Sequence, residues 1–400
     1  MRRLTASLLA ALTLLALTAA MAIPALAGLG AAPPGERGNA ASHAPDRILV
    51  KFKLGTDAAT AAAVHRQNSG TVIDTIPQID VQVVSVPAGT VPAKVAAYGR
   101  SAHVQYAEPD YIANAVGKPT PPPTVGADLY LSTQWGMTMV HAPEAWIVTK
   151  GLSSVKIAIL DTGIDQNHPD LASKIVAQKN FTGKGTPDDR YGHGTHVAGI
   201  AAAITNNGIG VAGLGYNSSL MNGKVLSDSG SGYYSWIASG ITWAADNGAK
   251  VINMSLGGSA EDLTLASAVD YAWSKGVVVV AAAGNNGNSS KFYPASYENC
   301  IAVAATDRSD VKASWSNYGS DWVDVAAPGV DIYSTLNTGG YGSMSGTSMA
   351  SPHVAGLAAL VWATGYGTSN ASVKSRIEGA VGSSQLWRYG RINALTAVAP

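Results

Sequence analysis

The segment 346–356, GTSMASPHVAG, surrounds a serine with small residues at the start of an apolar helix. Small neighbours let other backbone come close to Ser348, and the first turn of a helix directs unpaired N–H groups and positive dipole outward. This is a suitable place to expose a serine hydroxyl as a nucleophile. Ser348 could equally be a residue that caps a buried helix, and this segment alone leaves both interpretations open.

An aspartate and a histidine stand where they could activate such a hydroxyl. Asp161 directly follows the apolar residues 157–160, so its carboxylate is held at the edge of the core, where an unpartnered charge is costly. His193 lies between Gly192 and Gly194, which leaves its ring unobstructed at a helix start. By itself Asp161 is also compatible with an ordinary turn cap.

Asn285 is a candidate for binding a negatively charged oxygen. It follows the apolar segment 277–283 and Gly284, so its amide could point into the same cleft as a hydrogen-bond donor. Asn-Asn-Gly is, however, most often just a turn sequence.

A zinc site is the competing explanation for the histidines, because His193 and His196 are three residues apart. Zinc hydrolases with such a pair use H-E-x-x-H with a glutamate base, whereas Gly194 and Thr195 stand between these two histidines. We therefore predict a structural, hydrogen-bonded role for His196, and the same role for His168 and His353.

The elements that must position these residues alternate between apolar strands and helices from residue 127 to the C-terminus. The segments 155–163, 219–226, 250–258, 277–285 and 301–306 are typical of buried parallel strands. The pattern predicts an α/β fold with a doubly wound, mostly parallel sheet and helices on both faces. In such sheets the chemistry gathers at the carboxyl ends of the strands, where Asp161 and Asn285 lie.

The N-terminal part divides into four segments. Residues 1–27 have Arg2 and Arg3, an apolar run and an A-x-A ending, which predict a secretory signal peptide. Residues 28–45 read as a flexible spacer. Residues 46–116 give the order β-α-β-β-α-β of a small ferredoxin-like α+β domain. The proline-rich segment 117–126 is typical of a linker.

Composition argues against several classes of partner. The chain of 400 residues has a formal net charge of zero, so we expect no nucleic-acid partner. No later segment is apolar and long enough to span a membrane, so we expect no membrane partner. Cys300, the single cysteine, precedes an apolar strand and is predicted to be an inert buried thiol.

In the order Asp161, His193, Asn285, Ser348, these features resemble the subtilisin-like serine proteases, most closely their thermitase-like secreted branch. The resemblance extends from about Asp128 to the C-terminus and is carried by DTGID, GHGTHVAG, SLGG, AAAGNNG, DVAAPG and GTSMASPHVAG. Residues 46–116 are similar to the inhibitory propeptide of that family. The chain order of the three catalytic residues is that of subtilisin itself.

The resemblance implies a mechanism for these residues. Ser348 would be the nucleophile and His193 the general base, with Asp161 orienting the imidazole. The Asn285 side chain and the Ser348 N–H would hold the oxyanion. The product would be a secreted, monomeric endopeptidase that is made as a zymogen, processes itself within the linker 117–126, and has its own propeptide as an intramolecular inhibitor.

The resemblance also implies the sites for protein and peptide substrates. Two extended edges, Gly230-Ser231-Gly232 and Ser255-Leu256-Gly257, would pair with the substrate as a third strand, and Ala282, Ala283 and Gly284 would line the pocket for its side chain. Phe292 departs from relatives, which commonly have a smaller residue near the floor of that pocket. The segment 221–226, MNGKVL, also departs from the more apolar strand usual in the family, and Asn222, Gly223 and Lys224 have no assigned role.

Structural Ca²⁺ is a further implication of the resemblance. Asp128, Asp170 and Asn207 match side-chain ligands, and Thr205, Ile209 and Val211 would supply carbonyl oxygens; hard oxygen ligands of mixed origin suit calcium. An Asn-Gly turn with surface aspartates is the alternative. A second site expected in thermitase-like proteins would need acidic residues where Thr182, Gly183 and Lys184 stand, so we do not expect it here.

Two rival functions remain to be weighed. An α/β-hydrolase would need G-x-S-x-G followed by aspartate and then histidine, but Ala350 replaces the last glycine and only His353 follows the serine. A secreted binding protein of the same fold that has lost catalysis would be the other class. The intact set of Asp161, His193 and Ser348 argues against it.

Overall fold

The computed structural model describes residues 41–117, 130–183, 185–381 and 386–400. The predicted signal peptide, most of the spacer, and the linker beyond Gly117 lie outside these ranges, as does Asp128. In the part of the chain that is described, no helix is both long enough and apolar enough to cross a membrane.

The N-terminal domain has the predicted β-α-β-β-α-β order, and its strands are antiparallel in the spatial order β4-β1-β3-β2. Valines and isoleucines that alternate along β1 and β3 pack against Val64 of α1 and Tyr98 of α2. β1 begins at His43, inside the segment 28–45 expected to be a spacer. The elements are β1 (His43–Phe52), α1 (Ala58–Gln67), β2 (Thr71–Ile76), the 3₁₀ turn η1 (Pro77–Ile79), β3 (Val81–Ser85), α2 (Val91–Gly99) and β4 (Val104–Ala115).

The C-terminal domain is built on a parallel sheet of seven strands in the order β13-β12-β11-β9-β5-β7-β6. This confirms the predicted doubly wound α/β fold. The first strand of the chain in this sheet, β5, lies between β7 and β9, so the order reverses beside it. The strands are β5 (Lys156–Asp161), β6 (Ile175–Asn180), β7 (Ser219–Lys224), β9 (Val251–Met254), β11 (Val278–Ala282), β12 (Cys300–Thr306) and β13 (Val325–Pro328).

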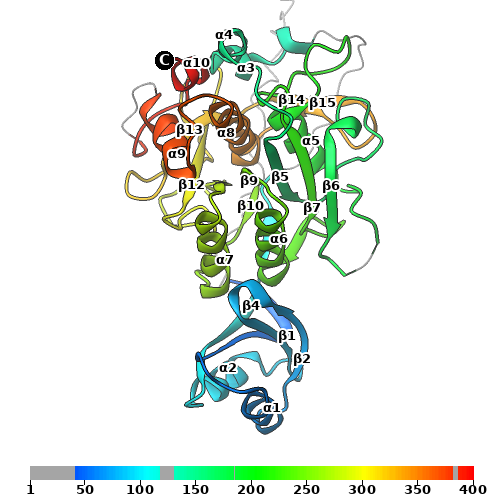
Figure 1. Cartoon of the computed structure of the whole chain (residues 1–400), viewed down its shortest axis with the longest axis vertical. Coiled ribbons are helices and arrows are strands. Elements are labelled where there is room, and N and C mark those ends of the chain that lie inside the picture. The colour runs from blue at the N-terminus through cyan, green and yellow to red at the C-terminus, as the bar shows by residue number, and fades with distance from the viewer. Residues whose placement is uncertain (1–40, 118–129, 184, 382–385) are drawn as a thin grey trace, which may run out of the picture. The chain divides into compact units, whose positions relative to one another are not determined.

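Both faces of this sheet are covered by helices (Figure 1). Along β5, Ile157 and Ile159 join the apolar cluster under α5 (His193–Ala202) and α8 (Thr347–Trp362). Ala158 and Leu160 join the cluster on the opposite face, under α6 (Tyr234–Asp246) and α7 (Leu263–Ser274). Because successive strand residues point to opposite faces, one apolar strand serves both layers.

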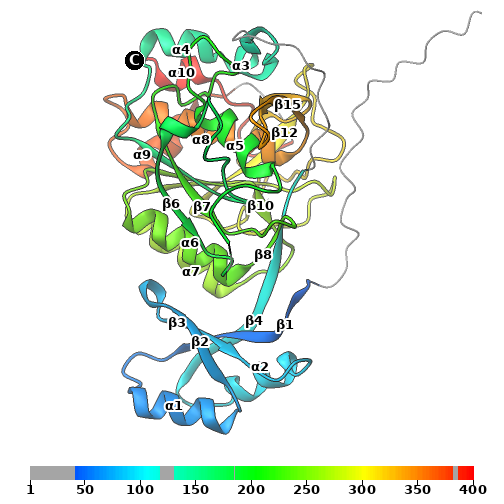
Figure 2. The ribbon, with the colours of Figure 1, turned by 90° about the vertical axis from the view of Figure 1, so that its right-hand side faces the viewer.

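Shorter elements complete the C-terminal domain. Among them, β8 and β10 matter for the site, because each pairs with β4 of the N-terminal domain. In Figure 2, β4 is the cyan strand that runs from β1 toward β8. These elements are η2 (Tyr130–Ser132), α3 (Trp135–Met139), α4 (Ala142–Val148), η3 (Ala172–Lys174), β8 (Ser231–Tyr233), β10 (Leu256–Gly257), β14 (Ile332–Thr335), β15 (Tyr341–Met344), α9 (Asn370–Gly379) and α10 (Ala394–Val398).

Candidate active site

Asp161 and His193 meet at the carboxyl end of β5. Asp161 is the last residue of that strand, His193 is the first of α5, and both side chains are fully buried. Asp161 Oδ1 lies 2.7 Å from His193 Nδ1, a short distance for a charge-assisted hydrogen bond. Burial opposes the charged imidazolium, but the attraction and hydrogen bond of the Asp161 carboxylate, together with the attraction of Asp189, outweigh it and raise the pKa of His193 above its ordinary value.

A second buried carboxylate, Asp189, fixes the start of α5. Its Oδ1 accepts hydrogen bonds from the Thr162 hydroxyl at 2.9 Å and from the Gly192 N–H at 2.8 Å. Its Oδ2 accepts from the N–H and the hydroxyl of Thr195. A carboxylate at a helix N-terminus satisfies N–H groups that have no partner within the helix. Asp189 thus fixes the backbone on either side of His193 and ties it to the residue after Asp161.

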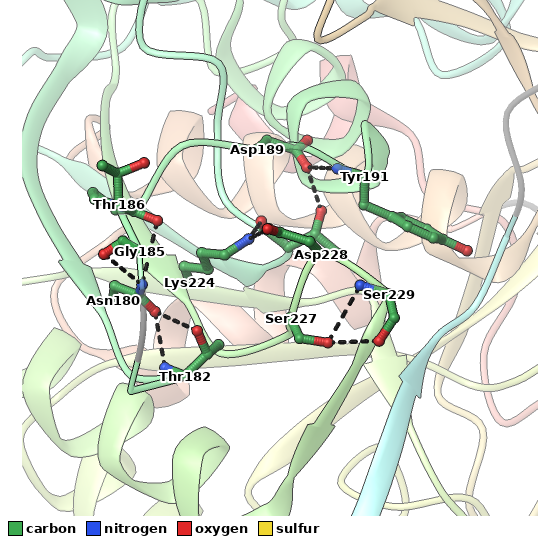
Figure 3. Close-up of polar contacts among 12 residues, drawn as sticks. Asn180, Thr182, Gly185, Thr186, Asp189, Tyr191, Lys224, Ser227, Asp228 and Ser229 are labelled. Atoms are coloured by element: carbon green, nitrogen blue, oxygen red, sulfur yellow. Dashed lines mark hydrogen bonds and ion pairs between the residues drawn. The ribbon is translucent and has the colours of Figure 1, made fainter.

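Lys224, the last residue of β7, supports the same strand end. Its side chain is almost wholly buried, and the ammonium donates to the Thr162 carbonyl and lies 2.9 Å from Asp228 Oδ1. Figure 3 shows Lys224 extending toward Asp228, and Asp189 toward the N–H of Tyr191. The sequence analysis missed Asp189, and it noted the segment that contains Lys224 as a departure without giving that residue a role. Their signals were an acidic residue just before a Gly-His helix start and a lysine inside an otherwise apolar segment.

Ser348 lies in the first turn of α8 and is fully buried. Its Oγ donates to the Ser255 carbonyl at 2.9 Å, while the Ser255 hydroxyl donates to the Ser348 carbonyl at 2.8 Å. His193 Nε2 is buried and has no hydrogen-bond partner among the described residues. The structure therefore contains the Asp161–His193 bond, whereas the Ser348 hydroxyl is turned toward Ser255.

The side chain of Asn285 has one fixed orientation. Its Oδ1 accepts from the Thr347 N–H at 3.0 Å and from the Thr347 hydroxyl at 2.9 Å. Because a backbone N–H can only donate, the oxygen must face Thr347, and the Nδ2 group is directed to the other side. There it donates to the carbonyl of Val116 at 3.2 Å. Thr347 is a further residue that sequence reasoning missed.

The end of β4 therefore runs directly through the site. A Cβ atom added to Gly346 would lie 2.6 Å from the Val116 oxygen, so only glycine lets that carbonyl approach the start of α8. A Cβ atom added to Gly117 would lie 3.6 Å from His193 Nε2. The peptide bond between Val116 and Gly117 thus lies beside Asn285, His193 and the first turn of α8.

The two edges expected to bind substrate flank β4. Ile112, Ala113 and Asn114 pair with β8, and Asn114 and Ala115 pair with β10. Beyond these ladders the Ala115 N–H donates to the Gly230 carbonyl at 2.8 Å. An extended segment of the chain's own N-terminal domain thus lies as a third strand between them. Gly230, Ser231 and Gly232 are on one side, and Ser255, Leu256 and Gly257 are on the other.

The residues proposed for calcium are partly brought together. Asp170 is fully buried, and its oxygens accept from Asn207 Nδ2 at 2.6 Å and from the Val211 N–H at 2.8 Å. Thr205 and Ile209 belong to the same irregular loop, whereas Asp128 lies outside the described residues. No ion pair found within the described ranges includes Asp170, and burial raises its pKa. A buried carboxylate beside an amide and loop carbonyls is a donor set that fits Ca²⁺.

The three histidines expected to be structural, and the cysteine, have such environments. His196 Nε2 and His168 Nε2 each lie 3.0 Å from a backbone oxygen, of Gly342 and Gly340 respectively, and His353 Nδ1 lies 2.9 Å from that of Met349. Cys300 is buried in β12, and burial raises the pKa of its thiol. Among the described residues no group of three or more His, Cys, Asp or Glu side chains could hold a metal ion.

Residues 153–390 match the model of the subtilase family of S8 peptidases. The chain belongs to the subtilase family. Residues 32–110 match a second model, that of the fervidolysin N-terminal prodomain. This subtilase is therefore a subtilisin-like serine endopeptidase, a hydrolase whose N-terminal domain is a propeptide, and it is made as a zymogen.

Individual relatives support the assignment over most of their own length. The thermophilic serine proteinase of Bacillus sp. (strain AK1) is 45% identical over 89% of this chain and 88% of its own. Thermitase of Thermoactinomyces vulgaris is 52% identical over 67% of this chain and 97% of its own. Subtilisin E of Bacillus subtilis (strain 168) is 40% identical over 89% of this chain and 91% of its own.

Proposed function

We propose that this subtilase is a secreted endopeptidase that cuts its own propeptide from the catalytic domain between Val116 and Gly117. One observation carries the proposal: the Val116 carbonyl accepts a hydrogen bond from Asn285 Nδ2, at the start of the helix that bears Ser348. Secretion follows from the signal sequence expected in residues 1–27. The bond proposed here lies at the N-terminal border of the linker in which maturation is expected.

In this proposal Ser348 is the nucleophile. Its hydroxyl turns from the Ser255 carbonyl to His193 Nε2, which takes the proton as Oγ bonds to the carbonyl carbon of Val116. Asp161 holds the ring by Nδ1 and stabilises the imidazolium. Hydrogen bonds in apo and zymogen sites often become catalytically aligned only as the reaction proceeds, so the present Ser348 rotamer is compatible with this role.

The tetrahedral oxygen would be stabilised by Asn285 Nδ2 and the Ser348 N–H, at a helix start with positive dipole. When the intermediate collapses, the C–N bond breaks and His193 returns its proton to the nitrogen of Gly117. The proximity of Gly117 to Nε2 supports this transfer. Water then hydrolyses the ester between Ser348 and Val116, and His193 again acts first as base and then as acid.

Protein and peptide substrates would occupy the place of β4. The edges at Gly230–Gly232 and Ser255–Gly257 offer backbone groups to any extended chain, which predicts broad endopeptidase specificity. Until it leaves, the cleaved propeptide would occupy the same edges and act as the inhibitor. We propose that mature enzyme is monomeric.

We also propose that the catalytic domain holds structural calcium. Asp170, Asn207 and the carbonyl oxygens of Thr205, Ile209 and Val211 would hold it, with Asp128 contributing from the start of the mature domain. Bound Ca²⁺ supplies a divalent charge for a buried carboxylate and a cross-link between segments. None of these residues belongs to the catalytic set.

The test is the fate of the full-length chain when Ser348 is replaced. Purified Ser348→Ala should remain at precursor mass, while wild type should yield two fragments with a new N-terminus at Gly117. Ser343→Ala, a serine of the neighbouring strand β15, is the matched control and should mature like wild type. A fluorophosphonate should label mature wild type at Ser348. Absence of both labelling and maturation in wild type would favour the binding-protein alternative.

A further inference from the structure

The aromatic ring of Phe292 lies close to two glycines, one in an edge strand that pairs with β4 and one directly before Asn285. A Cβ atom added to Gly257 would lie 2.4 Å from Phe292 Cε1, and one added to Gly284 would lie 3.1 Å from Phe292 Cδ1. Gly257 belongs to β10, one of the edges that pair with β4, and Gly284 directly precedes Asn285. The ring is therefore held between two glycines from separate walls of the site.

These contacts leave little room beside the ring. The side chain of Phe292 is buried, with only 5% of its surface exposed. Asn317 Nδ2 supports the Gly284 wall by donating to the Ala283 carbonyl at 2.8 Å, and the N–H of Asn317 donates to the Gly284 carbonyl at 2.9 Å. Interiors packed at this density do not admit a second ring without displacing the first.

Val116, the last propeptide residue before the proposed cleavage site, packs near Phe292 in the same apolar cluster. Its side chain is half-buried and packs against the apolar cluster that contains Phe292, Ala283 and Leu256. Its carbonyl marks it as the residue on the N-terminal side of the scissile bond, given the proposed function. The residue before the proposed cleavage site thus has a small, branched side chain, and it packs against the apolar cluster to which Phe292 belongs.

We infer that Phe292 closes the pocket for the residue preceding the scissile bond, so that this subtilase cleaves after small residues such as alanine and valine and discriminates against aromatic ones. The inference rests on the proposed function, whose cleavage site it uses. Phe292 acts here as a specificity-determining residue: it fills the space that a large substrate side chain would need.

The first experiment uses the full-length chain and a complementary pair of substitutions. Val116→Phe should slow self-processing by about tenfold or more, because the new ring competes with Phe292 for one space. Val116→Ala should process at a rate near wild type. Adding Phe292→Ala to Val116→Phe should restore processing, whereas adding Phe181→Ala, which removes a ring packed on Trp243, should not.

The second experiment uses mature wild-type enzyme and needs no substitution in the pocket. In a series of peptide p-nitroanilides that differ only in the last residue, kcat/KM should be about tenfold or more higher for alanine and valine than for phenylalanine. Phe292→Ala enzyme, its active sites counted by fluorophosphonate titration, should show a higher ratio of phenylalanine to alanine cleavage. Phe181→Ala should keep the wild-type ratio.

The outcomes separate this inference from the proposed function. If wild type cleaves neither itself nor any anilide, the proposed function fails. If wild type processes normally but Val116→Phe processes equally fast, the inference about Phe292 is overturned. A preference of the wild-type enzyme for phenylalanine anilide would overturn it as well. Rescue of Val116→Phe by Phe292→Ala alone supports it.

Discussion

The amide of Asn285 is oriented before any substrate oxygen becomes charged. The N–H and the hydroxyl of Thr347 both donate to Asn285 Oδ1. These two hydrogen bonds hold the amide so that Nδ2 stays directed at the Val116 carbonyl. A donor fixed in this way costs no reorganisation when the oxyanion develops, and its hydrogen bond strengthens mainly in the transition state.

Asn285→Ala should therefore lower kcat far more than it raises KM. Removal of one oxyanion donor typically costs about 10²–10³ in kcat. Steady-state kinetics on a small peptide substrate would measure the split. Asn286→Ala, in the adjacent position, is the control and should keep kcat near wild type. A variant of Asn285 with weaker substrate binding and unchanged kcat would contradict the oxyanion role.

The raised pKa of His193 predicts the acid side of the pH profile. Only the neutral imidazole can accept the Ser348 proton, so kcat/KM should rise with pH through a pKa above 6.5. In Asp161→Asn the stabilising carboxylate is lost, so this limb should move to lower pH, while kcat falls by about 10⁴. The pH dependence of kcat/KM for both enzymes tests this. A limb that stays in place in Asp161→Asn would contradict the pairing.

At the residue scale the sequence marks the proposed reacting groups more clearly than the residues that support them. Each of these groups stands at the end of an apolar strand or at the start of a helix, and both features can be recognised from the neighbouring sequence. The groups are Asp161, His193, Asn285 and Ser348. Asp189 and Thr347 act only through hydrogen bonds that form on folding, and no motif in the sequence predicts those bonds. Phe292 departs from the family pattern, but its proposed effect depends on two glycines from distant segments.

The propeptide strand β4 does more than fill the cleft, because two of its acidic side chains cap helices of the catalytic domain. The N-cap residue of α6 makes no capping hydrogen bond with its side chain. Asp110 of β4 takes that role, because it accepts from the Ser235 N–H at 3.0 Å and from the Ser235 hydroxyl at 2.7 Å. Glu108 accepts from the N–H groups of Leu263 and Thr264 at the start of α7. Carboxylates at helix N-termini are favourable positions for negative charge.

Asp110→Ala should therefore weaken the complex of cleaved propeptide and enzyme by about 1–3 kcal/mol. Burial raises the pKa of Asp110 to about 6, against the opposing hydrogen bonds of Ser235, so the test belongs at pH 8, where the carboxylate is charged. The delay between cleavage on gels and the onset of peptidase activity should shorten. Asp46→Ala, on β1 and half-exposed, is the control. An unchanged delay in Asp110→Ala would argue against the cap.

At the scale of elements, the sequence predicted β5, β7, β9, β11 and β12 of the parallel sheet but not β13, although β13 is apolar and buried. The strands β5, β7, β9 and β11 lie within the predicted segments, and β12 begins one residue earlier than predicted, at Cys300. It did not predict β6, an edge strand whose residues alternate between partly buried and exposed, or the short strands β14 and β15, which carry Ser and Gly residues. Ile332, Tyr333 and Thr335 of β14 do favour strands, but β14 and β15 have only 4 residues each, which is too short for a strand period to stand out in the sequence.

The whole catalytic domain contains a single, unpaired cysteine, so it has no covalent cross-link of its own. Calcium joining Asp128, Asp170 and the loop at Asn207 would tie the start of the mature domain to its body. Its stabilisation follows mass action and reaches roughly 2.7 kcal/mol at a hundredfold excess of calcium over its dissociation constant.

We expect heat inactivation to be much faster in EDTA than in millimolar calcium, with initial rates at low temperature unchanged after brief chelation. Asp170→Asn should shorten the half-life in calcium toward the EDTA value. Asp165→Asn, an aspartate of the same loop region outside the proposed ligands, is the control. Equal half-lives in both buffers for wild type and Asp170→Asn would remove calcium from the proposal and leave the protease assignment intact.

Strand β4 pairs both with the propeptide strand β1 and with the edge strands β8 and β10. The proposed cut after Val116 therefore removes none of the backbone pairs between β4 and these strands. Cleavage and activation are then separate events in time. Cutting is a first-order process that dilution does not slow, whereas the first molecules to shed their propeptide can digest the propeptides of others. Activity should accordingly appear after a lag and then rise faster at higher protein concentration, as in a chain reaction. With the secretion proposed here, such a delay would give the cell time to move a destructive product away from itself.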